Sequence, residues 1–260
     1  VCDYLYDSIA AVLKNGAISY VKWDFNRNMS EVGSTDLPVD RQQEVSHRYY
    51  LGLYSLLERL VTDFPDVLFE SCSGGGGRFD CGMLYYMPQT WTSDNSDAIE
   101  RLPIQHGTSL VYPLSSMSAH VSASPNHQTG HVTPFDTRFN VAFTGSFGYE
   151  LDPTALSEEE QSLVRRTAEF YKKYSHVAAN GRYFRLRSCY EGDCAAWEYI
   201  SDDDSICIAE YVLTHVRVYP HYERLKLKGL DPDARYRDDS GNQYTGSELM
   251  GYGIPVDLTY

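Results

Sequence analysis

The segment "AISYVKWD" (residues 17–24) begins with apolar residues and ends with two charged ones, Lys22 and Asp24. Its isoleucine, tyrosine and valine are typical of a buried strand. Lys22 and Asp24 lie on one face at its end, because side chains alternate along a strand. A carboxylate there needs a partner to offset its desolvation, and the ammonium two residues earlier can supply one. The segment therefore predicts a strand that ends in a structural ion pair or in a reactive site.

Helices and strands are predicted to alternate around this segment. The spacing of apolar residues predicts helices at 3–15, 41–64 and 157–178, and Ser157 with Glu160 forms a capping box for the last. Apolar runs predict further strands at 67–72, 87–94, 109–114 and 140–148. Such alternation predicts a mainly parallel sheet, open or closed into a barrel.

From Gly181 onward the pattern changes to short alternating segments, such as "YFRLRS" and "AAWEYIS", separated by polar turns. This is typical of antiparallel strands. We therefore predict a boundary near residue 180, with one domain over 1–180 and a second over 181–260.

Composition narrows the function classes. The formal net charge of −14 argues against a nucleic-acid partner, since binding to phosphates depends on clustered Lys and Arg. No apolar run approaches the roughly 18–20 residues that span a bilayer, so no membrane partner is expected. The six cysteines are scattered and include no CxxC pair, which favours free thiols and a cytoplasmic location; Cys189 and Cys194 could instead pair in an oxidising compartment.

Three polar clusters follow predicted strands: Lys22 with Asp24, "CSGGGGRFD" (72–80) and "WTSDNSD" (91–97). In α/β barrels, groups at the carboxyl ends of strands converge on one site. The run of four glycines lacks the GK[ST] of a phosphate-binding loop, but it lets the backbone approach a ligand closely. We expect the three clusters to meet.

The third cluster carries two carboxylates, Asp94 and Asp97. Asp97 is suited to cap a helix that begins at Ala98, which leaves Asp94 as the better candidate for chemistry. Two carboxylates from separate strands are the minimum for glycoside hydrolysis. No HExxH, GxSxG or GxGxxG motif is present. A loose histidine cluster at 120–131 is better explained by loop hydrogen bonds, so neither a metal nor a cofactor is expected.

Five motifs together resemble the α-galactosidases of glycoside hydrolase family 36. They are "KWDFNR" (22–27), "CSGGGGRFD" (72–80), "WTSDNSDAIERL" (91–102), "SSMSAHVSASPNHQTG" (115–130) and "GYELD" (148–152). The resemblance implies strands four to eight of a (β/α)8 TIM barrel, followed by a C-terminal antiparallel β-sandwich. It further implies a retaining enzyme that removes terminal α-1,6-linked galactose from melibiose and raffinose-family oligosaccharides, and a homotetramer.

The resemblance also implies roles for individual residues. Asp24 matches the nucleophile and Asp94 the general acid/base. The residues implied to bind the galactose-containing substrate are Lys22, Trp23, Asn26, Cys72, Gly74, Gly75, Arg78 and Trp91. Lys22 is expected to favour the ionised form of Asp24.

The numbering of the strands leads to one further expectation. If Asp24 ends the fourth barrel strand, strands one to three are not in these 260 residues, so we expect the chain to be a segment of a longer polypeptide. A sheet of the remaining strands would expose apolar surface at its edges.

Two other functions stay open. A galactosyltransferase of the raffinose or stachyose synthase type would use the same aspartates, and a non-catalytic carbohydrate-binding protein would use neither. Product analysis with an added acceptor distinguishes the first, and covalent labelling of Asp24 distinguishes the second.

Overall fold

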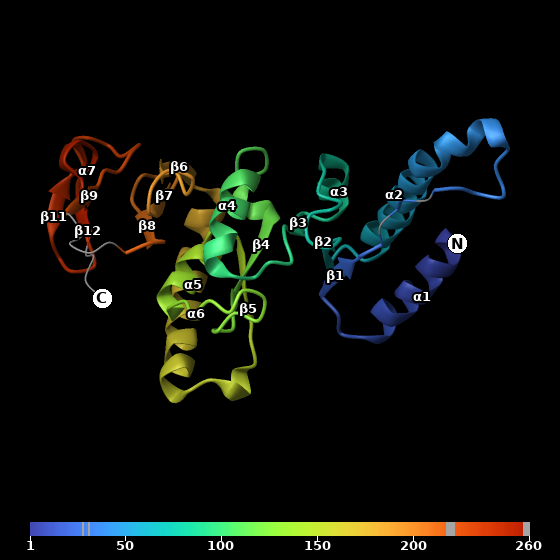
Figure 1. The fold of residues 1–260 in the computed structure, drawn as a ribbon, viewed down its shortest axis with the longest axis horizontal. Helices are drawn as coiled ribbons and strands as arrows, with labels where there is room; N and C mark the ends of the chain where they lie inside the picture. The colour runs from blue at the N-terminus through green and yellow to red at the C-terminus, as the bar shows by residue number, and fades with distance from the viewer. Residues whose placement is uncertain (28, 31, 217–221, 257–260) are drawn as a thin grey trace. The chain divides into compact units, whose positions relative to one another are not determined.

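The computed structural model describes residues 1–27, 29–30, 32–216 and 222–256 (Figure 1). It divides into two compact units, Val1–Asp94 and Asn95–Tyr260. The predicted boundary near residue 180 lies inside the second unit, where a long helix gives way to antiparallel strands. That domain division stays a prediction.

The first unit is built from parallel strands and the helices between them. Its elements are α1 (Cys2–Asn15), β1 (Tyr20–Asp24), the 3₁₀ helix η1 (Val39–Glu44), α2 (Val45–Asp63), β2 (Leu68–Cys72), α3 (Cys81–Tyr86) and β3 (Gln89–Trp91). Strand β1 pairs in parallel with β2, with Asp24 opposite Cys72, and β2 pairs in parallel with β3. The carboxyl ends of these strands therefore lie along one edge, as the sequence predicts.

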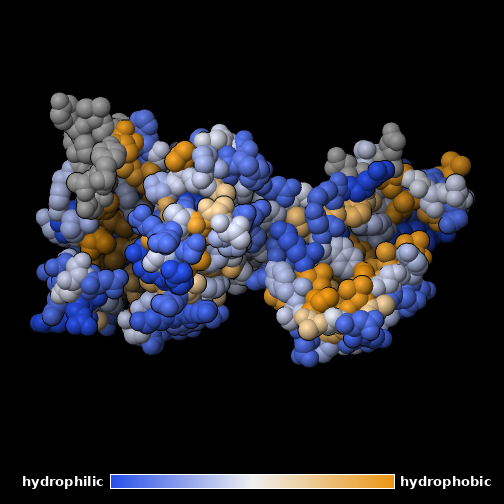
Figure 2. Space-filling model, turned by 90° about the horizontal axis from the view of Figure 1, so that it is seen from below, coloured by the Kyte–Doolittle hydropathy of each residue, from blue (hydrophilic) through white to orange (hydrophobic). Residues whose placement is uncertain are grey.

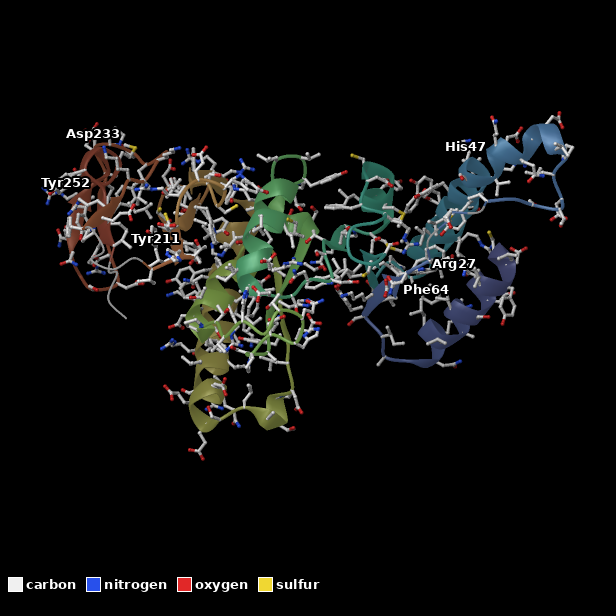
Figure 3. The ribbon with its side chains drawn as sticks, in the orientation of Figure 1. Arg27, His47, Phe64, Tyr211, Asp233 and Tyr252 are labelled. Carbon is white, nitrogen blue, oxygen red and sulfur yellow. The ribbon has the colours of Figure 1, made fainter. Side chains whose placement is uncertain are left out.

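The two faces of this sheet differ in polarity. Four buried leucines of α2, at positions 53, 56, 57 and 60, share a core with Phe69 of β2. Val21 and Trp23 of β1 pack against the same core, and so does Phe64, which follows α2 (Figure 3). Because side chains alternate along β1, Lys22 and Asp24 face away from this core. The polar face is thus left for the site.

The second unit begins with helices around a parallel pair of strands and continues into antiparallel sheets. Its helical and parallel part contains α4 (Ala98–Thr108), η2 (Leu114–Ser116), β4 (Met117–Ser122), α5 (Phe135–Phe143), β5 (Ser146–Glu150), η3 (Pro153–Ala155) and α6 (Glu158–Asn180). Its antiparallel part contains β6 (Arg182–Arg187), β7 (Cys194–Ile200), β8 (Cys207–Leu213), β9 (Glu223–Leu225), β10 (Arg235–Arg237), β11 (Gln243–Thr245), α7 (Gly246–Gly251) and β12 (Ile254–Val256). The predicted capping box at Ser157 and Glu160 is present. The predicted change from parallel to antiparallel strands is confirmed.

Two of the predicted strands are wrong. Residues 109–112 form a turn after α4 and Leu114 begins η2, so the strand comes later, as β4. Residues 140–143 belong to α5, and the strand is β5. The helical period was in fact present, since Phe135, Phe139 and Phe143 recur every four residues and all three are buried. An apolar run read alone does not separate a buried strand from a buried helix.

Strand β7 lies between two hydrophobic cores and is buried along its whole length. On one face, Trp197 and Tyr199 belong to a core that includes Phe143 of α5. On the other, Ala196 and Ile200 pack with Leu225 of β9, among other residues. Near the second core, the hydroxyl of Tyr211 donates to Glu223 at 3.0 Å (Figure 3). One face of the β7 sheet therefore packs against helices such as α5, and the other packs against strand β9.

Two buried carboxyl groups lie in the sheet formed by β7 and β8. Glu198 is fully buried, and it accepts the backbone N–H of Lys228 at 2.7 Å; Glu210 is 6% exposed. Burial raises the pKa of Glu198 to about 7, against the opposing effect of the Lys228 N–H, and burial raises the pKa of Glu210 to about 8. Both groups therefore stay protonated in the folded sheet at pH values at which they ionise in the unfolded chain.

These carboxyls should make the second unit less stable as the pH rises. Their unfolded pKa lies near 4.5, so between about pH 5 and 8 the unfolded state binds fewer protons than the folded state. We expect the free energy of unfolding to fall over this range by on the order of a few kcal/mol. Thermal or urea unfolding measured from pH 5 to 8 gives the free energy of unfolding at each pH. This free energy should fall less steeply with pH in the double variant E198Q/E210Q than in the wild type. The exposed-site variant E191Q is the control, and an unchanged slope in the double variant would contradict the assignment.

Hydrophobic residues also lie at the surface, shown in orange in Figure 2. In the first unit, Val12 of α1 is 60% exposed and Leu51 of α2 is 55% exposed. Both residues lie on helices, so the expectation of apolar surface at the sheet edges stays a prediction. Among the residues that the structure describes, none of the helices has the length and apolar composition needed to cross a membrane.

Candidate active site

Asp24 lies at the carboxyl end of β1, and neighbouring groups hold its side chain in place. The amide of Asn26 donates through Nδ2 to Asp24 Oδ2 at 2.6 Å. The thiol of Cys72, opposite Asp24 in the strand register, also hydrogen-bonds to the carboxylate. The N–H of Phe25 donates to the carbonyl of Cys72 at 3.0 Å, which ties the ends of β1 and β2 together. Asp24 is therefore presented at the strand edge as an oriented acceptor.

The surroundings of Asp24 favour its ionised form. Partial desolvation acts to raise its pKa, but hydrogen bonds from Cys72, Asn26 and the Phe25 N–H outweigh this and lower the pKa below its usual value. The positive charge of Lys22 acts in the same direction and is the smallest of these effects. Lys22 therefore lowers the pKa of Asp24, as predicted, but the hydrogen bonds lower it more. Burial raises the pKa of the Cys72 thiol itself to about 11, so it stays protonated and remains a donor.

Lys22 is held on the same polar face by groups from the next two strands. Its ammonium lies 3.8 Å from Glu70 Oε1 and 4.6 Å from the centre of the Trp91 ring. Glu70 is only 2% exposed, and it also accepts a hydrogen bond from the hydroxyl of Tyr20. Lys22 and Trp91, both predicted to bind substrate, therefore meet on one surface.

Glu70 is part of this surface and was missed in the sequence interpretation. Its signal was available, because in "VLFESC" the residue two before Cys72 must lie on the same face of the strand. A buried carboxylate next to an ammonium also obeys the rule that buried charges are paired.

The glycine loop brings the ends of β2 and β3 into direct contact. Gly75 has φ +83°, and a Cβ atom there would lie 2.5 Å from Ser93 Cα and 3.1 Å from the backbone nitrogen of Asp94. Gly74, with φ +54°, donates its N–H to Asn26 Oδ1. Predicted site residues from all three strand ends, including both aspartates, are thus linked by successive close contacts within the first unit.

Replacing Gly75 with alanine should damage both stability and activity. The left-handed backbone costs about 1–3 kcal/mol for a residue with a Cβ, and the contact with Ser93 would in addition displace the backbone that carries Asp94. The matched control is Gly241, which has φ +87° and no atom within 4 Å of an added Cβ. G241A should show a modest loss of stability and unchanged turnover, measured by thermal unfolding and by initial rates. If G75A and G241A lose the same amount of stability and have the same turnover, the contact with Ser93 has no measurable effect.

Two of the residues predicted to bind substrate are placed differently. Trp23 packs on the helix-facing core, on the face of β1 opposite Lys22 and Asp24. Arg78 is 5% exposed, and its guanidinium donates to the carbonyls of Cys72 at 2.9 Å and Trp23 at 3.3 Å while lying over the Phe25 ring. Trp23 therefore lies on the face away from Asp24, and Arg78 holds the ends of β1 and β2 through their backbone carbonyls.

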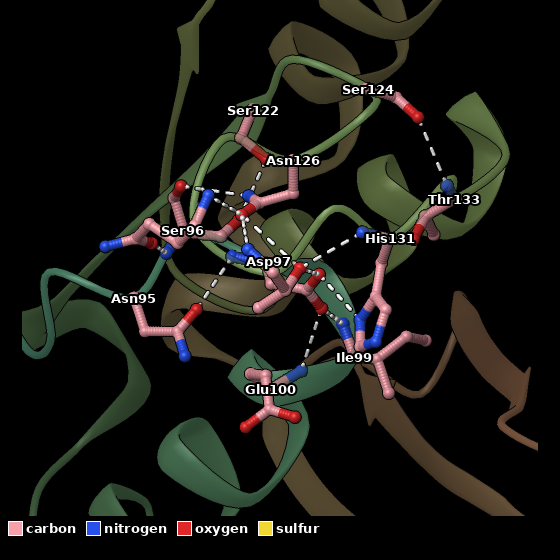
Figure 4. Close-up of polar contacts among 12 residues, drawn as sticks. Asn95, Ser96, Asp97, Ile99, Glu100, Ser122, Ser124, Asn126, His131 and Thr133 are labelled. Atoms are coloured by element: carbon pink, nitrogen blue, oxygen red, sulfur yellow. Dashed lines mark hydrogen bonds and ion pairs between the residues drawn. The ribbon is translucent and has the colours of Figure 1, made fainter.

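Asp97 serves as a helix cap, as the sequence suggests. Its Oδ1 accepts the N–H groups of Ile99 and Glu100 at the start of α4, and its Oδ2 accepts from Thr129 and His131 at 2.5 and 2.9 Å (Figure 4). Its pKa is lowered because these hydrogen bonds outweigh its burial. The network continues through Ser96, Ser122, Asn126 and Gln128. Both oxygens of Asp97 are thus used in holding the start of α4 and the loop that follows β4.

The histidines at 120 and 131 make separate ion-pair contacts, with Glu150 and Asp97 respectively. In the part of the chain that the structure describes, no three His, Cys, Asp or Glu residues gather in a way that could hold a metal. All six cysteines are free thiols.

Comparison with known proteins places the chain in a family. The family model "Melibiase" matches residues 1–181, and that of the "Glycosyl hydrolase family 36 C-terminal domain" matches residues 194–259. The chain is 51% identical to alpha-galactosidase AgaA of Geobacillus stearothermophilus over 98% of its length, and 47% identical to Mel36A of Lactobacillus acidophilus over 98%. It covers 35% of each, so it spans about a third of the length of these curated relatives.

Solved structures agree with the sequence matches. The crystal structure of GH36 alpha-galactosidase AgaA from Geobacillus stearothermophilus matches 100% of this chain, and 36% of that one, with a TM-score of 0.97 and 50% identity. The galactosidase domain of the alpha-galactosidase–sucrose kinase AgaSK matches with a TM-score of 0.94 and 46% identity, again over 100% of this chain and 35% of that one. The predicted barrel segment and C-terminal antiparallel domain are confirmed by these matches. Since the first family model alone covers most of its length, the chain belongs to the melibiase family, glycoside hydrolase family 36.

Proposed function

We propose that the protein that carries this chain is a retaining α-galactosidase, which removes terminal α-1,6-linked galactose from melibiose and raffinose-family oligosaccharides. The observation that carries the proposal is the linkage of two aspartates within the first unit: Asp24 is oriented and ionised at the end of β1, and the glycine loop contacts the backbone that carries Asp94. One carboxylate and one carboxylic acid on a shared edge are the groups that glycoside hydrolysis requires.

The comparisons support this choice of substrate and residues. Two structures of AgaA variants hold raffinose and stachyose, and in each of them one aspartate is replaced. The two replaced aspartates are separated by seventy positions in that chain, which is also the separation of Asp24 and Asp94 (94 − 24 = 70).

In the proposed reaction the carboxylate of Asp24 attacks the anomeric carbon while the bond to the leaving oxygen breaks. Asp94 gives its proton to that oxygen, so the departing sugar leaves as a neutral alcohol. In the second step Asp94 takes a proton from water, the water oxygen attacks the same carbon, and the bond to Asp24 breaks. Two inversions give galactose with its original configuration. The two carboxyl groups should lie about 5–5.5 Å apart in the working enzyme.

Lys22 and Trp91 have a distinct part in this proposal. An ammonium held between Glu70 and an aromatic ring is a fixed donor for sugar hydroxyls, and the buried indole of Trp91 helps to fix its position. Binding energy from these contacts would position the anomeric carbon against Asp24.

The stereochemical course of the reaction tests the proposal. The full-length protein should release α-galactose first from an aryl α-galactoside, seen by ¹H NMR before mutarotation. Initial release of the β-anomer would exclude the double displacement. Absence of turnover, together with absence of a covalent adduct from a mechanism-based fluorinated galactoside, would favour a binding protein. Predominant transfer to added sucrose would favour a galactosyltransferase.

A further inference from the structure

The side chain of Asn26 bridges the proposed nucleophile and the glycine loop. Its Nδ2 donates to Asp24 Oδ2 at 2.6 Å, and its Oδ1 accepts the N–H of Gly74. The two contacts use opposite ends of one amide. Asn26 therefore connects the end of β1 with the turn that follows β2.

The contact with Gly74 determines which end of the amide faces Asp24. A backbone N–H can only donate, so the atom that meets Gly74 must be the amide oxygen. The NH₂ group is then directed at Asp24, where it can only donate. The amide thus favours the charged form of Asp24, because both oxygens of a carboxylate accept hydrogen bonds. A neutral carboxyl group carries a hydrogen on one oxygen, and with that oxygen toward the NH₂ group two donors would face each other.

The backbone around Asn26 is itself held in place. The hydroxyl of Ser73 donates to the carbonyl of Phe25 at 2.6 Å, and the N–H of Phe25 donates to the carbonyl of Cys72. Gly74 lies between Ser73 and Gly75, and Gly75 contacts the backbone at Ser93. The amide of Asn26 is therefore anchored on the same loop that positions the second strand end.

We propose that Asn26 is a positioning residue for Asp24: its amide, oriented by Gly74, holds the nucleophile ionised and aimed along one direction. This differs from the role in substrate binding that the family resemblance implies for Asn26, and it rests on the proposed function of Asp24. Hydrogen bonds to a charged group from an already oriented donor cost little reorganisation during the reaction.

Several charged or titratable groups surround Asp24 in the first unit. They are Lys22 on its own strand, Glu70 and Cys72 on β2, Arg78 after the glycine loop and Asp94 after β3. All of them stay unchanged when Asn26 is replaced. A change in the pH profile on replacement of Asn26 is therefore attributable to its amide.

The test compares N26A and N26D with the wild type in the full-length protein. The acidic limb of the kcat/KM profile reports the group that must be ionised in the free enzyme. Loss of a hydrogen bond to a charged group should lower kcat/KM about ten- to a hundredfold in N26A, and the acidic limb should move up by about one pH unit. N26D keeps the shape of the side chain but places a second negative charge next to Asp24. The acidic limb of its kcat/KM profile should therefore move to higher pH by at least as much as in N26A.

Two controls separate positioning from folding and from sugar binding. N15A removes an asparagine amide of the same unit, which donates to the carbonyl of Ala11 within α1, and should leave the acidic limb in place. The affinity of each variant for galactose, measured by calorimetry at neutral pH, should change less than threefold. A large loss of galactose affinity with an unmoved acidic limb would overturn the proposal and return Asn26 to substrate binding.

A second readout does not depend on turnover. The rate at which a fluorinated galactoside forms an adduct on Asp24, followed by mass spectrometry, should show the same displaced limb in N26A and N26D. If the acidic limb of the adduct-formation rate lies at the same pH in the wild type, N26A and N26D, the role of Asn26 is overturned and the proposed function is not affected. A wild-type protein that forms neither product nor adduct would overturn the proposed function, and this inference with it.

Discussion

Replacing Asp24 with alanine should lower kcat/KM for an aryl α-galactoside by about four to six orders of magnitude, which is the scale expected when a covalent nucleophile is removed. The fold should survive the change. Asp24 is exposed at the end of β1, and its side chain interacts with Asn26, Cys72, the Phe25 N–H and Lys22. The strand pairing is formed by backbone groups and does not depend on this side chain. Rates are measured by release of the aryl group, and folding by the thermal unfolding midpoint.

The control for this variant is Asp36, an exposed aspartate in the same unit. D36A should retain the activity of the wild type. Added azide or formate should partly restore turnover in D24A and give the β-linked product, because a small nucleophile can occupy the space left by the carboxylate. Hydrolysis by D24A within tenfold of the wild type would remove Asp24 from its assigned role.

Replacing Asp94 with asparagine should have an effect that depends on the leaving group. For raffinose, whose leaving oxygen needs a proton, kcat/KM should fall about a hundredfold to ten-thousandfold. For an aryl galactoside with an acidic phenol the loss in the first step should be much smaller, because that oxygen departs without a proton. The variant should accumulate the covalent intermediate, since water is no longer activated.

Azide provides the matching test for Asp94. It needs no general base, so it should accelerate the second step in D94N and give the α-linked galactosyl azide, the opposite anomer from that expected with D24A. D97N is the comparison variant: Asp97 caps α4 and binds Thr129 and His131, so its loss should lower stability and leave the dependence on the leaving group unchanged. An equal loss on both substrates in D94N would contradict its role as an acid.

Much of the fold and the site could be predicted from short segments. The strand ending in Lys22 and Asp24, the amphipathic helix α2 and the capping box of α6 each follow from local spacing, and all are present. The assignment of Asp97 to helix capping also followed from its place before Ala98. These features depend on interactions between residues close in the chain, which a sequence displays directly.

The errors arose where local patterns are ambiguous. In "SLVYPL" an apolar run with one β-branched residue, Val111, forms a turn that leads into η2. Pro113, which cannot donate to a ladder, indicates this in the sequence. In "NVAFTGSFG" the apolar residues belong to the end of α5, whose phenylalanines are buried by contacts with α6 and β7. An apolar run that begins at Asn140 covers only the last turn of α5, which is too short to show the helical period of Phe135, Phe139 and Phe143.

The sequence by itself determined the family and most of the strands and helices, and it predicted roles for two aspartates, because motifs and periodicity are properties of neighbouring residues. Only the tertiary structure decided which side chains surround Asp24. It turned Trp23 toward the helix-facing core and placed Arg78 on the carbonyl of Cys72. It also brought the buried Glu70 to Lys22 and set the Asn26 amide between Asp24 and Gly74. The physical reason is that these contacts join residues some fifty positions apart, and the register of two paired strands, rather than distance along the chain, determines which of them meet.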